Sequence, residues 1–180
     1  MRAILFAAGR GERMKPLTAR RPKALLEVGG KPLIAWQVER LAAGGIREIV
    51  VNVAHLGEQL EAALGDGSRY GVSIAWSREP EPLETAGAVA WAREAIGDSP
   101  FLAVSADIHT AFDYASLRPA AEAIARDPAA RAAHFVLVPN PPHRQKGDFS
   151  LHASAVRVVD GAVFLTGPSG FGKTTLAYAC

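Results

Sequence analysis

The sequence has very little cysteine: the only one is Cys180, the last of its 180 residues. A disulfide within the chain is therefore impossible, and nothing in the sequence demands an oxidising compartment. Long apolar runs are also missing, since none approaches the roughly 18 residues that a membrane span needs. The apolar start at 1–8 ends at charged residues too early to form the core of a signal peptide. We expect a cytoplasmic protein with no membrane partner.

The sequence also lacks an excess of charge of either sign. Twenty Lys and Arg residues stand against 18 Asp and Glu residues, which leaves a net charge of +2. This balance is too close to neutral to favour nucleic acid or a membrane surface as a partner. Hydrophobic residues make up 49% and charged residues 21%, which excludes a disordered chain. The length suits one domain with a sizeable core.

Short apolar runs alternate with longer helical patterns along the chain. The strands that we expect lie at 3–7, 49–53, 72–76, 101–104 and 135–138, with short ones at 155–159 and 162–166. They are apolar throughout, as strands covered on both faces are. Helices are expected at 32–43, 56–64, 85–96 and 114–126, with Thr85 as a candidate N-cap. The alternation predicts an α/β fold with a mostly parallel, Rossmann-like sheet, which binds ligands at the carboxyl ends of its strands.

The loop after the first expected strand combines glycine with basic residues. Gly9 and Gly11 allow positive φ and a close approach of backbone N–H groups to an anion, and Arg13, Lys15 and Lys23 add positive charge. A solvated glycine turn is the plain alternative. A dinucleotide fingerprint is disfavoured, because Met14 replaces its third glycine and Pro16 would disrupt a helix starting there. We expect an extended loop that wraps around phosphates.

Segments 5–18, 22–26 and 30–34 resemble the signature of the sugar-1-phosphate nucleotidyltransferases. Further stretches, at 65–71, 81–87, 138–143 and 147–149, resemble one branch, the N-acetylmuramate 1-phosphate uridylyltransferases of cell-wall recycling. The resemblance covers 1–151, which we take as the N-terminal part of a nucleotidyltransferase domain. It implies a sheet of that family's type, incomplete at its C-terminal side, because the family's second half has no match after Phe149.

The resemblance implies that a sugar 1-phosphate attacks the α-phosphorus of a nucleoside triphosphate, which in this branch is UTP, and that pyrophosphate leaves. Arg13 would hold the triphosphate and stabilise the leaving pyrophosphate, and Lys23 would steady the charge growing at the α-phosphate. The residues that would contact the nucleotide are Ala8, Gly9, Gly11, Gln59, Thr85 and Gly87. The oligomeric state cannot be read from the sequence.

Asp107 stands at the end of an expected strand, where the family has an aspartate that binds Mg²⁺. The alternative is an aspartate that only caps the next turn. Ala106 replaces the family's usual glycine, so the site requires a backbone that tolerates a Cβ atom there. By the same resemblance, Asp148 would face the sugar. The histidines show no metal-ligand spacing, and we expect them to be core or surface residues.

The C-terminal segment 152–180 carries a second phosphate-loop motif, whose defining residues are Gly167, Gly172, Lys173 and Thr174. It resembles the opening of the HPr kinases, in which Lys173 would contact phosphates and Thr174 would contact Mg²⁺. No later strand supplies an acidic metal ligand, so we favour a segment that adds a strand and a short helix to the edge of the first domain. Three hypotheses remain: a nucleotidyltransferase, a P-loop ATP-binding module and a non-catalytic nucleotide-binding remnant.

Overall fold

The computed structural model describes residues 1–129, 133–136, 158–159, 162–163 and 178–179. Its main sheet has eight strands in the described part of the chain, in the order β5, β4, β1, β6, β10, β7, β9, β8. Their bounds are β1 Arg2–Phe6, β4 Glu48–Val53, β5 Ser73–Arg78, β6 Phe101–Ser105, β7 His134–Val136, β8 Val158–Val159, β9 Ala162–Val163 and β10 Tyr178–Ala179. A separate hairpin pairs β2 (Glu27–Val28) with β3 (Lys31–Pro32).

The first four long strands form a parallel core. β1 lies in its centre, paired with β4 on one side and β6 on the other, and β5 continues the parallel order beyond β4. β10 is antiparallel to both β6 and β7. The structure therefore confirms the predicted α/β class and the mostly parallel sheet. It also brings the carboxyl ends of β1, β4 and β6 to the same edge.

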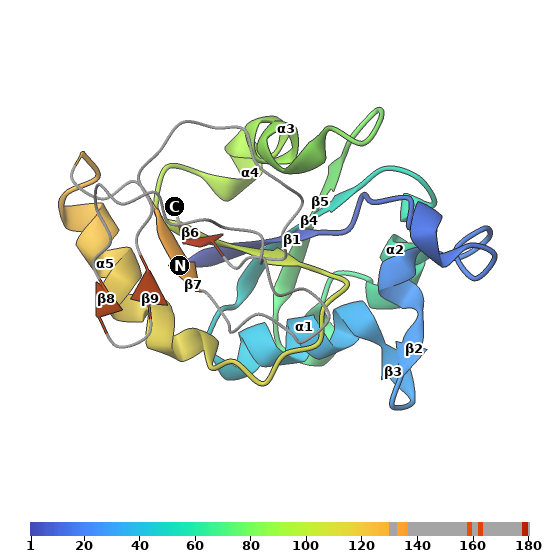
Figure 1. Cartoon of the computed structure of the whole chain (residues 1–180), viewed down its shortest axis with the longest axis horizontal. Helices are drawn as coiled ribbons and strands as arrows, with labels where there is room; N and C mark the ends of the chain where they lie inside the picture. The colour runs from blue at the N-terminus through green and yellow to red at the C-terminus, as the bar shows by residue number, and fades with distance from the viewer. Residues whose placement is uncertain (130–132, 137–157, 160–161, 164–177, 180) are drawn as a thin grey trace.

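Helices cover both faces of the parallel strands. Their bounds are α1 Leu33–Ala43, α2 Gly57–Leu64, α3 Glu84–Trp91, α4 Arg93–Ile96 and α5 Arg118–Arg126. Short 3-10 helices lie at η1 Glu12–Met14, η2 Lys23–Leu25, η3 Ser68–Tyr70 and η4 Tyr114–Leu117. α3 and α4 lie on one face of the sheet and α1 on the other (Figure 1). In the described residues, no helix combines the length and apolar character needed to cross a membrane.

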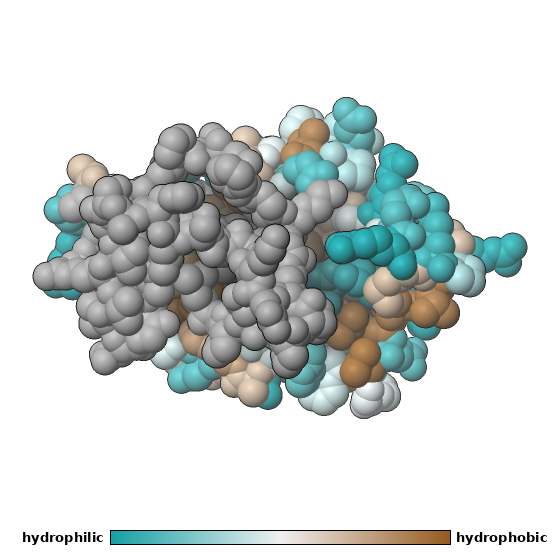
Figure 2. All heavy atoms as spheres, in the orientation of Figure 1, coloured by the Kyte–Doolittle hydropathy of each residue, from teal (hydrophilic) through white to brown (hydrophobic). Residues whose placement is uncertain are grey.

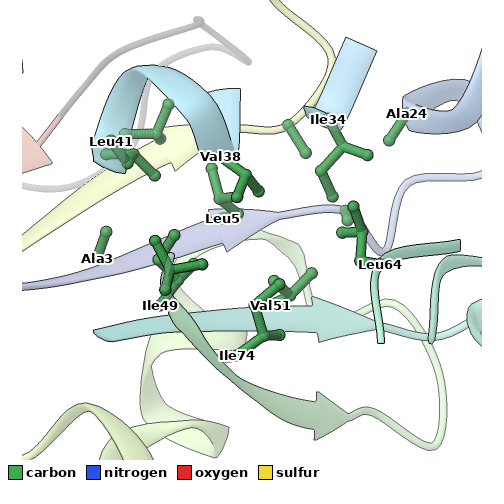
Figure 3. Packing of buried hydrophobic residues seen from close by; sticks show 14 of the residues in the cluster. Ala3, Leu5, Ala24, Ile34, Val38, Leu41, Ile49, Val51, Leu64 and Ile74 are labelled. Carbon is green, nitrogen blue, oxygen red and sulfur yellow. The ribbon is translucent and has the colours of Figure 1, made fainter. Parts of the chain in front are cut away.

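The core has a part on each side of the sheet, because alternate residues of each strand face opposite helices. The two parts are unequal in size. Leu5 belongs to the larger cluster, where Ile34, Val38 and Leu41 of α1 pack onto the strands (Figure 3). Ile4 belongs to the smaller cluster, which reaches Ile96 of α4. Both β1 side chains are fully buried. A continuous apolar run in β1 is thus explained by helices on both faces.

β5 corrects the expectation that all the strands are covered on both faces. Its burial is mixed: Ile74 and Ser77 are buried, Trp76 is half-buried, and Ser73, Ala75 and Arg78 are exposed. The reason is that β5 lies at the edge of the sheet, where β4 is the only described strand that pairs with it. The sequence of this strand was therefore closer to a half-exposed strand than to a fully covered one.

Two further expectations need correction. The helix predicted at 85–96 is two helices, α3 and α4, separated at Ala92, and its N-cap is Leu83 rather than Thr85, which lies inside α3. The helix expected after the second phosphate-loop motif does not include Tyr178, which belongs to β10. The strand expected at 162–166 corresponds to β9, which with β8 forms the end of the sheet beyond β7, whereas β10 lies between β6 and β7. The boundary proposed between 151 and 152 lies outside the described residues.

At the end of the molecule that carries the first loop, α2 and the β2–β3 hairpin, the visible surface is mainly hydrophilic with some hydrophobic residues among them (Figure 2). Leu17 in this loop and Val28 in the hairpin are among the large hydrophobic side chains that are exposed. This end of the molecule also carries the cavity described next.

Candidate functional site

A cavity of about 990 Å³ opens at the carboxyl ends of β1, β4 and β6. Its wall is formed by the loop after β1, by Lys23, by the end of β4, by the approach to α3 and by the residues that follow β6. The predicted residues that line it are Ala8, Gly9, Gly11, Arg13, Lys23, Thr85 and Asp107. The structure thus brings together residues from four separate segments of the chain, as the rule for parallel sheets leads one to expect.

The loop after β1 is held in a wrapped shape by Gly11. This residue has φ +63°, and a Cβ atom placed on it would lie 2.9 Å from Thr18 Cγ2. The buried hydroxyl of Thr18 donates a hydrogen bond of 2.8 Å to the Gly11 carbonyl oxygen. No α-helix begins here; the chain makes only η1 and then a series of turns. The expectation that no α-helix starts at this turn is confirmed, but the loop is not extended, because η1 begins at Glu12, and Gly9 does not use positive φ.

Lys23 and Asp107 meet on one wall of the cavity. Lys23 Nζ lies 2.5 Å from Asp107 Oδ2, and the Ser105 hydroxyl donates a 2.6 Å hydrogen bond to Asp107 Oδ1. Burial by itself would raise the pKa of Asp107, but the hydrogen bonds from Lys23 and Ser105 outweigh it, so the pKa lies below its ordinary value. Asp107 is therefore ionised at neutral pH, with both of its oxygen atoms held in place.

The backbone on the N-terminal side of Asp107 is an extension of the sheet. The Ala106 N–H donates a 3.0 Å hydrogen bond to the Phe6 carbonyl oxygen, which continues the pairing of β1 with β6. Ala106 is fully buried and is not among the residues with positive φ. The methyl group at this position is accommodated in the core, so the replacement of the family's usual glycine by alanine does not distort the site.

A buried amide–carboxylate link crosses the base of the cavity, and the sequence analysis did not identify it. Asn52 Oδ1 accepts a 2.8 Å hydrogen bond from the Ala7 N–H, and Asn52 Nδ2 donates one of 2.6 Å to Glu79 Oε1. Glu79 Oε2 accepts from the Leu83 N–H at 3.0 Å. The link joins the loop after β1 to the approach to α3. Its signal in the sequence was a polar residue, Asn52, within an apolar run.

The cavity wall is not uniformly basic. Arg10, Arg13 and Lys23 supply positive charge, whereas Glu12, Glu81, Glu84 and Asp107 supply negative charge. Arg13 is exposed and makes no hydrogen bond or ion pair with another described residue. A polyanion here would meet carboxylates as well as cations, and a divalent cation would reduce that repulsion.

Several predicted residues lie elsewhere. Lys15 forms an ion pair with Glu12 and does not line the cavity. Gln59 of α2 donates a 3.0 Å hydrogen bond to the Arg20 carbonyl oxygen and does not line it either. Gly87 lies inside α3, where a Cβ atom would come within 2.7 Å of Leu83 Cβ, and it is also absent from the wall. The predicted roles of Gln59 and Gly87 in nucleotide binding are therefore not supported by the geometry.

Other predicted residues lie outside the described part of the chain. They are Asp148 and the members of the second phosphate-loop motif, Gly167, Gly172, Lys173 and Thr174. Within the described residues, no group of three or more His, Cys, Asp or Glu side chains could hold a metal ion. Asp107, the predicted cation ligand, lies on the cavity wall.

Glu84 has an unusual backbone conformation at the cavity wall. Its φ is +59°, a region that residues with a Cβ atom rarely occupy, and it is the first residue of α3. Such strain is found most often at functional sites. The sequence analysis did not single out Glu84.

Comparison with known proteins agrees with this geometry. The sequence model of the family described as "Nucleotidyl transferase" matches residues 2–153. The N-acetylmuramate alpha-1-phosphate uridylyltransferase of Neisseria meningitidis is 53% identical over 152 residues, which is 84% of this chain and 64% of that protein. A mannose-1-phosphate guanyltransferase of Schizosaccharomyces pombe is 41% identical over 120 residues, 65% of this chain and 33% of that protein.

The fold has relatives among solved structures. A Bacillus anthracis protein assigned as a glucose-1-phosphate thymidylyltransferase matches with a TM-score of 0.61 at 27% sequence identity. The match covers 70% of this chain and 50% of that one. The chain thus spans between one third and two thirds of the length of these relatives.

Proposed function

The chain belongs to the nucleotidyl transferase family, and on this premise we propose that it transfers a uridylyl group from UTP to N-acetylmuramate 1-phosphate, with release of pyrophosphate. One observation carries the proposal: the Gly11 loop, Lys23 and Asp107 converge on a single cavity at the carboxyl ends of the parallel strands. The choice of UTP and of this sugar follows from the 53% identity to the Neisseria enzyme. A cytoplasmic location is part of the same proposal.

The reaction asks the protein for positioning and for neutralisation of charge. A phosphate oxygen of the sugar 1-phosphate attacks the α-phosphorus of UTP, a new P–O bond forms, and the bond to the β-phosphate breaks in line with it. In this proposal, backbone N–H groups of the loop containing Gly9 and Gly11 hold the phosphates. Arg13, which has no other described partner, stabilises the leaving pyrophosphate.

Lys23 steadies the charge at the α-phosphate in this proposal. Its ammonium forms an ion pair with Asp107. A bound triphosphate offers Lys23 other anionic partners, and Asp107 is then available to a cation. Asp107, with the phosphates, is the residue that would hold Mg²⁺, which when bound neutralises the charge on phosphate oxygens. The carboxylates along the wall make such neutralisation necessary. Asp148 remains a candidate for contact with the sugar.

The test is the release of pyrophosphate from UTP and N-acetylmuramate 1-phosphate in the presence of Mg²⁺, with calorimetry of UTP binding alongside it. Arg13→Ala and Lys23→Met are expected to reduce the rate by about 10²- to 10³-fold each. Arg20→Ala and Lys15→Met are the matched controls, since neither residue lines the cavity. Neither turnover nor UTP binding by the unaltered chain would reject the proposal; binding without turnover would support the nucleotide-binding remnant.

The P-loop hypothesis makes the opposite prediction about which residue matters. If the motif that ends at Lys173 and Thr174 binds ATP, Lys173→Ala abolishes ATP binding and Arg13→Ala leaves it unchanged. If ATP binding is absent, or if it depends on Arg13, the motif has no role in binding a nucleotide here.

A further inference from the structure

The loop that follows Asp107 has no regular structure until η4 begins at Tyr114. On the other side of Asp107, the hydrogen bond from Ala106 to Phe6 fixes the chain to the sheet. Besides the hydrogen bonds from Lys23 and Ser105, the position of the Asp107 carboxylate therefore depends on what holds the backbone at Ile108 and beyond. α1, which packs beneath this loop, supplies the contacts.

Gln37 of α1 is the buried contact. Its Nε2 atom donates a 2.6 Å hydrogen bond to the Ile108 carbonyl oxygen, directly after Asp107 in the chain. Gln37 is only 1% exposed. Two neighbours on α1 reach the same loop: the Trp36 ring meets the His109 ring edge-on at 5.3 Å, and Arg40 Nη1 lies 3.5 Å from the Ala111 carbonyl oxygen. Both of these are at the surface or at the limit of hydrogen-bonding distance, so Gln37 is the strongest anchor.

The Ile108 carbonyl fixes which way the Gln37 amide faces, and Tyr114 holds the oxygen side of that amide. Its hydroxyl lies 2.7 Å from Gln37 Oε1 and donates to it. The Ile108 carbonyl can only accept a hydrogen bond, so Nε2 must face Ile108 and Oε1 must face the hydroxyl. Tyr114 is 2% exposed, and burial raises its pKa to about 12, so the hydroxyl keeps its proton at neutral pH.

We propose that Gln37 and Tyr114 are positioning residues for Asp107, and that their hydrogen bonds set the geometry with which the site takes up a divalent cation together with a nucleotide. The inference rests on the proposed function, because it takes Asp107 to be the cation's carboxylate. Neither residue lines the cavity, so neither is expected to contact a ligand. Their effect passes through the backbone at Ile108.

The test compares UTP affinity with and without Mg²⁺ by calorimetry in Gln37→Met and Tyr114→Phe. Gln37→Met removes both hydrogen bonds, and Tyr114→Phe removes only the hydroxyl that orients the amide. The factor by which Mg²⁺ strengthens UTP binding should fall by about 10- to 100-fold in Gln37→Met and by less in Tyr114→Phe. Affinity for UTP without Mg²⁺ should stay at its original value in both variants.

Ile74→Val is the control, because it removes one buried methylene from β5, at the opposite edge of the parallel strands. All variants are measured at a temperature where circular dichroism shows them folded, and if Gln37→Met does not fold, Tyr114→Phe decides alone. An unchanged Mg²⁺ effect in the folded variants, or an equal loss in Ile74→Val, overturns the inference and leaves the proposed function intact. UTP binding by the unaltered chain that ignores Mg²⁺ contradicts the role of Asp107 itself.

Discussion

Gly9 and Gly11 stand two positions apart in the same loop, yet different constraints act on them. Gly11 has φ +63° and no room for a Cβ atom, since Thr18 and Lys23 lie against it. Gly9 has no positive φ, and a Cβ atom there would meet nothing within 4 Å. Gly11 is thus required by the shape of the loop, whereas Gly9 leaves space at the cavity.

This difference predicts that alanine at the two positions has separable effects. Gly11→Ala should lower the free energy of unfolding by about 1–2 kcal/mol, because alanine is disfavoured at positive φ and its methyl group crowds Thr18. Gly9→Ala should leave that free energy within about 0.5 kcal/mol of the original but weaken UTP binding, because its methyl group blocks close approach of phosphates. Urea unfolding and calorimetry measure the two effects; equal losses of stability would contradict the assignment.

At the residue scale, the side chains proposed to act on the ligand were easier to predict from the sequence than the side chains that hold them in place. Arg13, Lys23 and Asp107 were expected at one site from a resemblance, and the structure places all three at the cavity. Gln37 and Glu79 were missed, because a single polar residue in a helix or a loop carries no signal about its partner. Lys15 was expected near phosphates and pairs with Glu12 instead, since a local ion pair three residues away is always within reach.

At the scale of elements, the strands were the most predictable part, because each is an apolar run that ends in turn residues. The helix at 85–96 was predicted as continuous, but the chain turns at Ala92. Its alanine-rich sequence suits a helix throughout, so propensity gave no sign of the break. What fixes the start of α3 is the hydrogen bond from the Leu83 N–H to Glu79, a contact between segments that periodicity does not report.

The link through Asn52 should therefore stabilise several elements at once. Asn52→Ala leaves the Ala7 N–H and Glu79 Oε1 without this partner in buried surroundings, and the free energy of unfolding should fall by about 1–3 kcal/mol. Gln59→Ala removes a hydrogen bond nearer the surface and should cost less than about 0.5 kcal/mol. Urea unfolding compares the two variants. A cost for Asn52→Ala no greater than that for Gln59→Ala would show that the link does not hold the elements together.

At the scale of the whole molecule, the α/β class and the parallel core were predictable, whereas the placing of β10 between β6 and β7 was not. Alternating strand and helix patterns imply a parallel sheet on topological grounds. A two-residue strand such as Tyr178–Ala179 leaves too short a pattern to recognise, and its partners lie more than 40 positions earlier in the chain. The formation and position of such a strand depend on its pairing with distant parts of the chain rather than on its local sequence.

The stability of the whole fold should depend on pH through His134 of β7. Burial lowers the pKa of His134 below its ordinary value of 6.5. The unfolded chain then binds more protons than the folded one, so stability is greatest above about pH 6.5 and falls as the pH drops through the lowered pKa. Urea unfolding between about pH 7 and about pH 5 gives the free energy of unfolding at each pH. The slope of this free energy against pH should be shallower in His134→Gln than in the original chain. Identical slopes in both proteins would exclude His134 as the source.

The contact between Lys23 and Asp107 has a consequence for which anions can bind in the cavity. A free phosphate or sulfate ion must compete with a carboxylate that is already in place, and it brings no cation to satisfy that carboxylate once it is displaced. A metal-bound nucleotide brings partners for both side chains at once. Under the proposed function, the Lys23–Asp107 ion pair thereby disfavours small anions of the surrounding solution relative to a ligand that arrives with its own counter-ion.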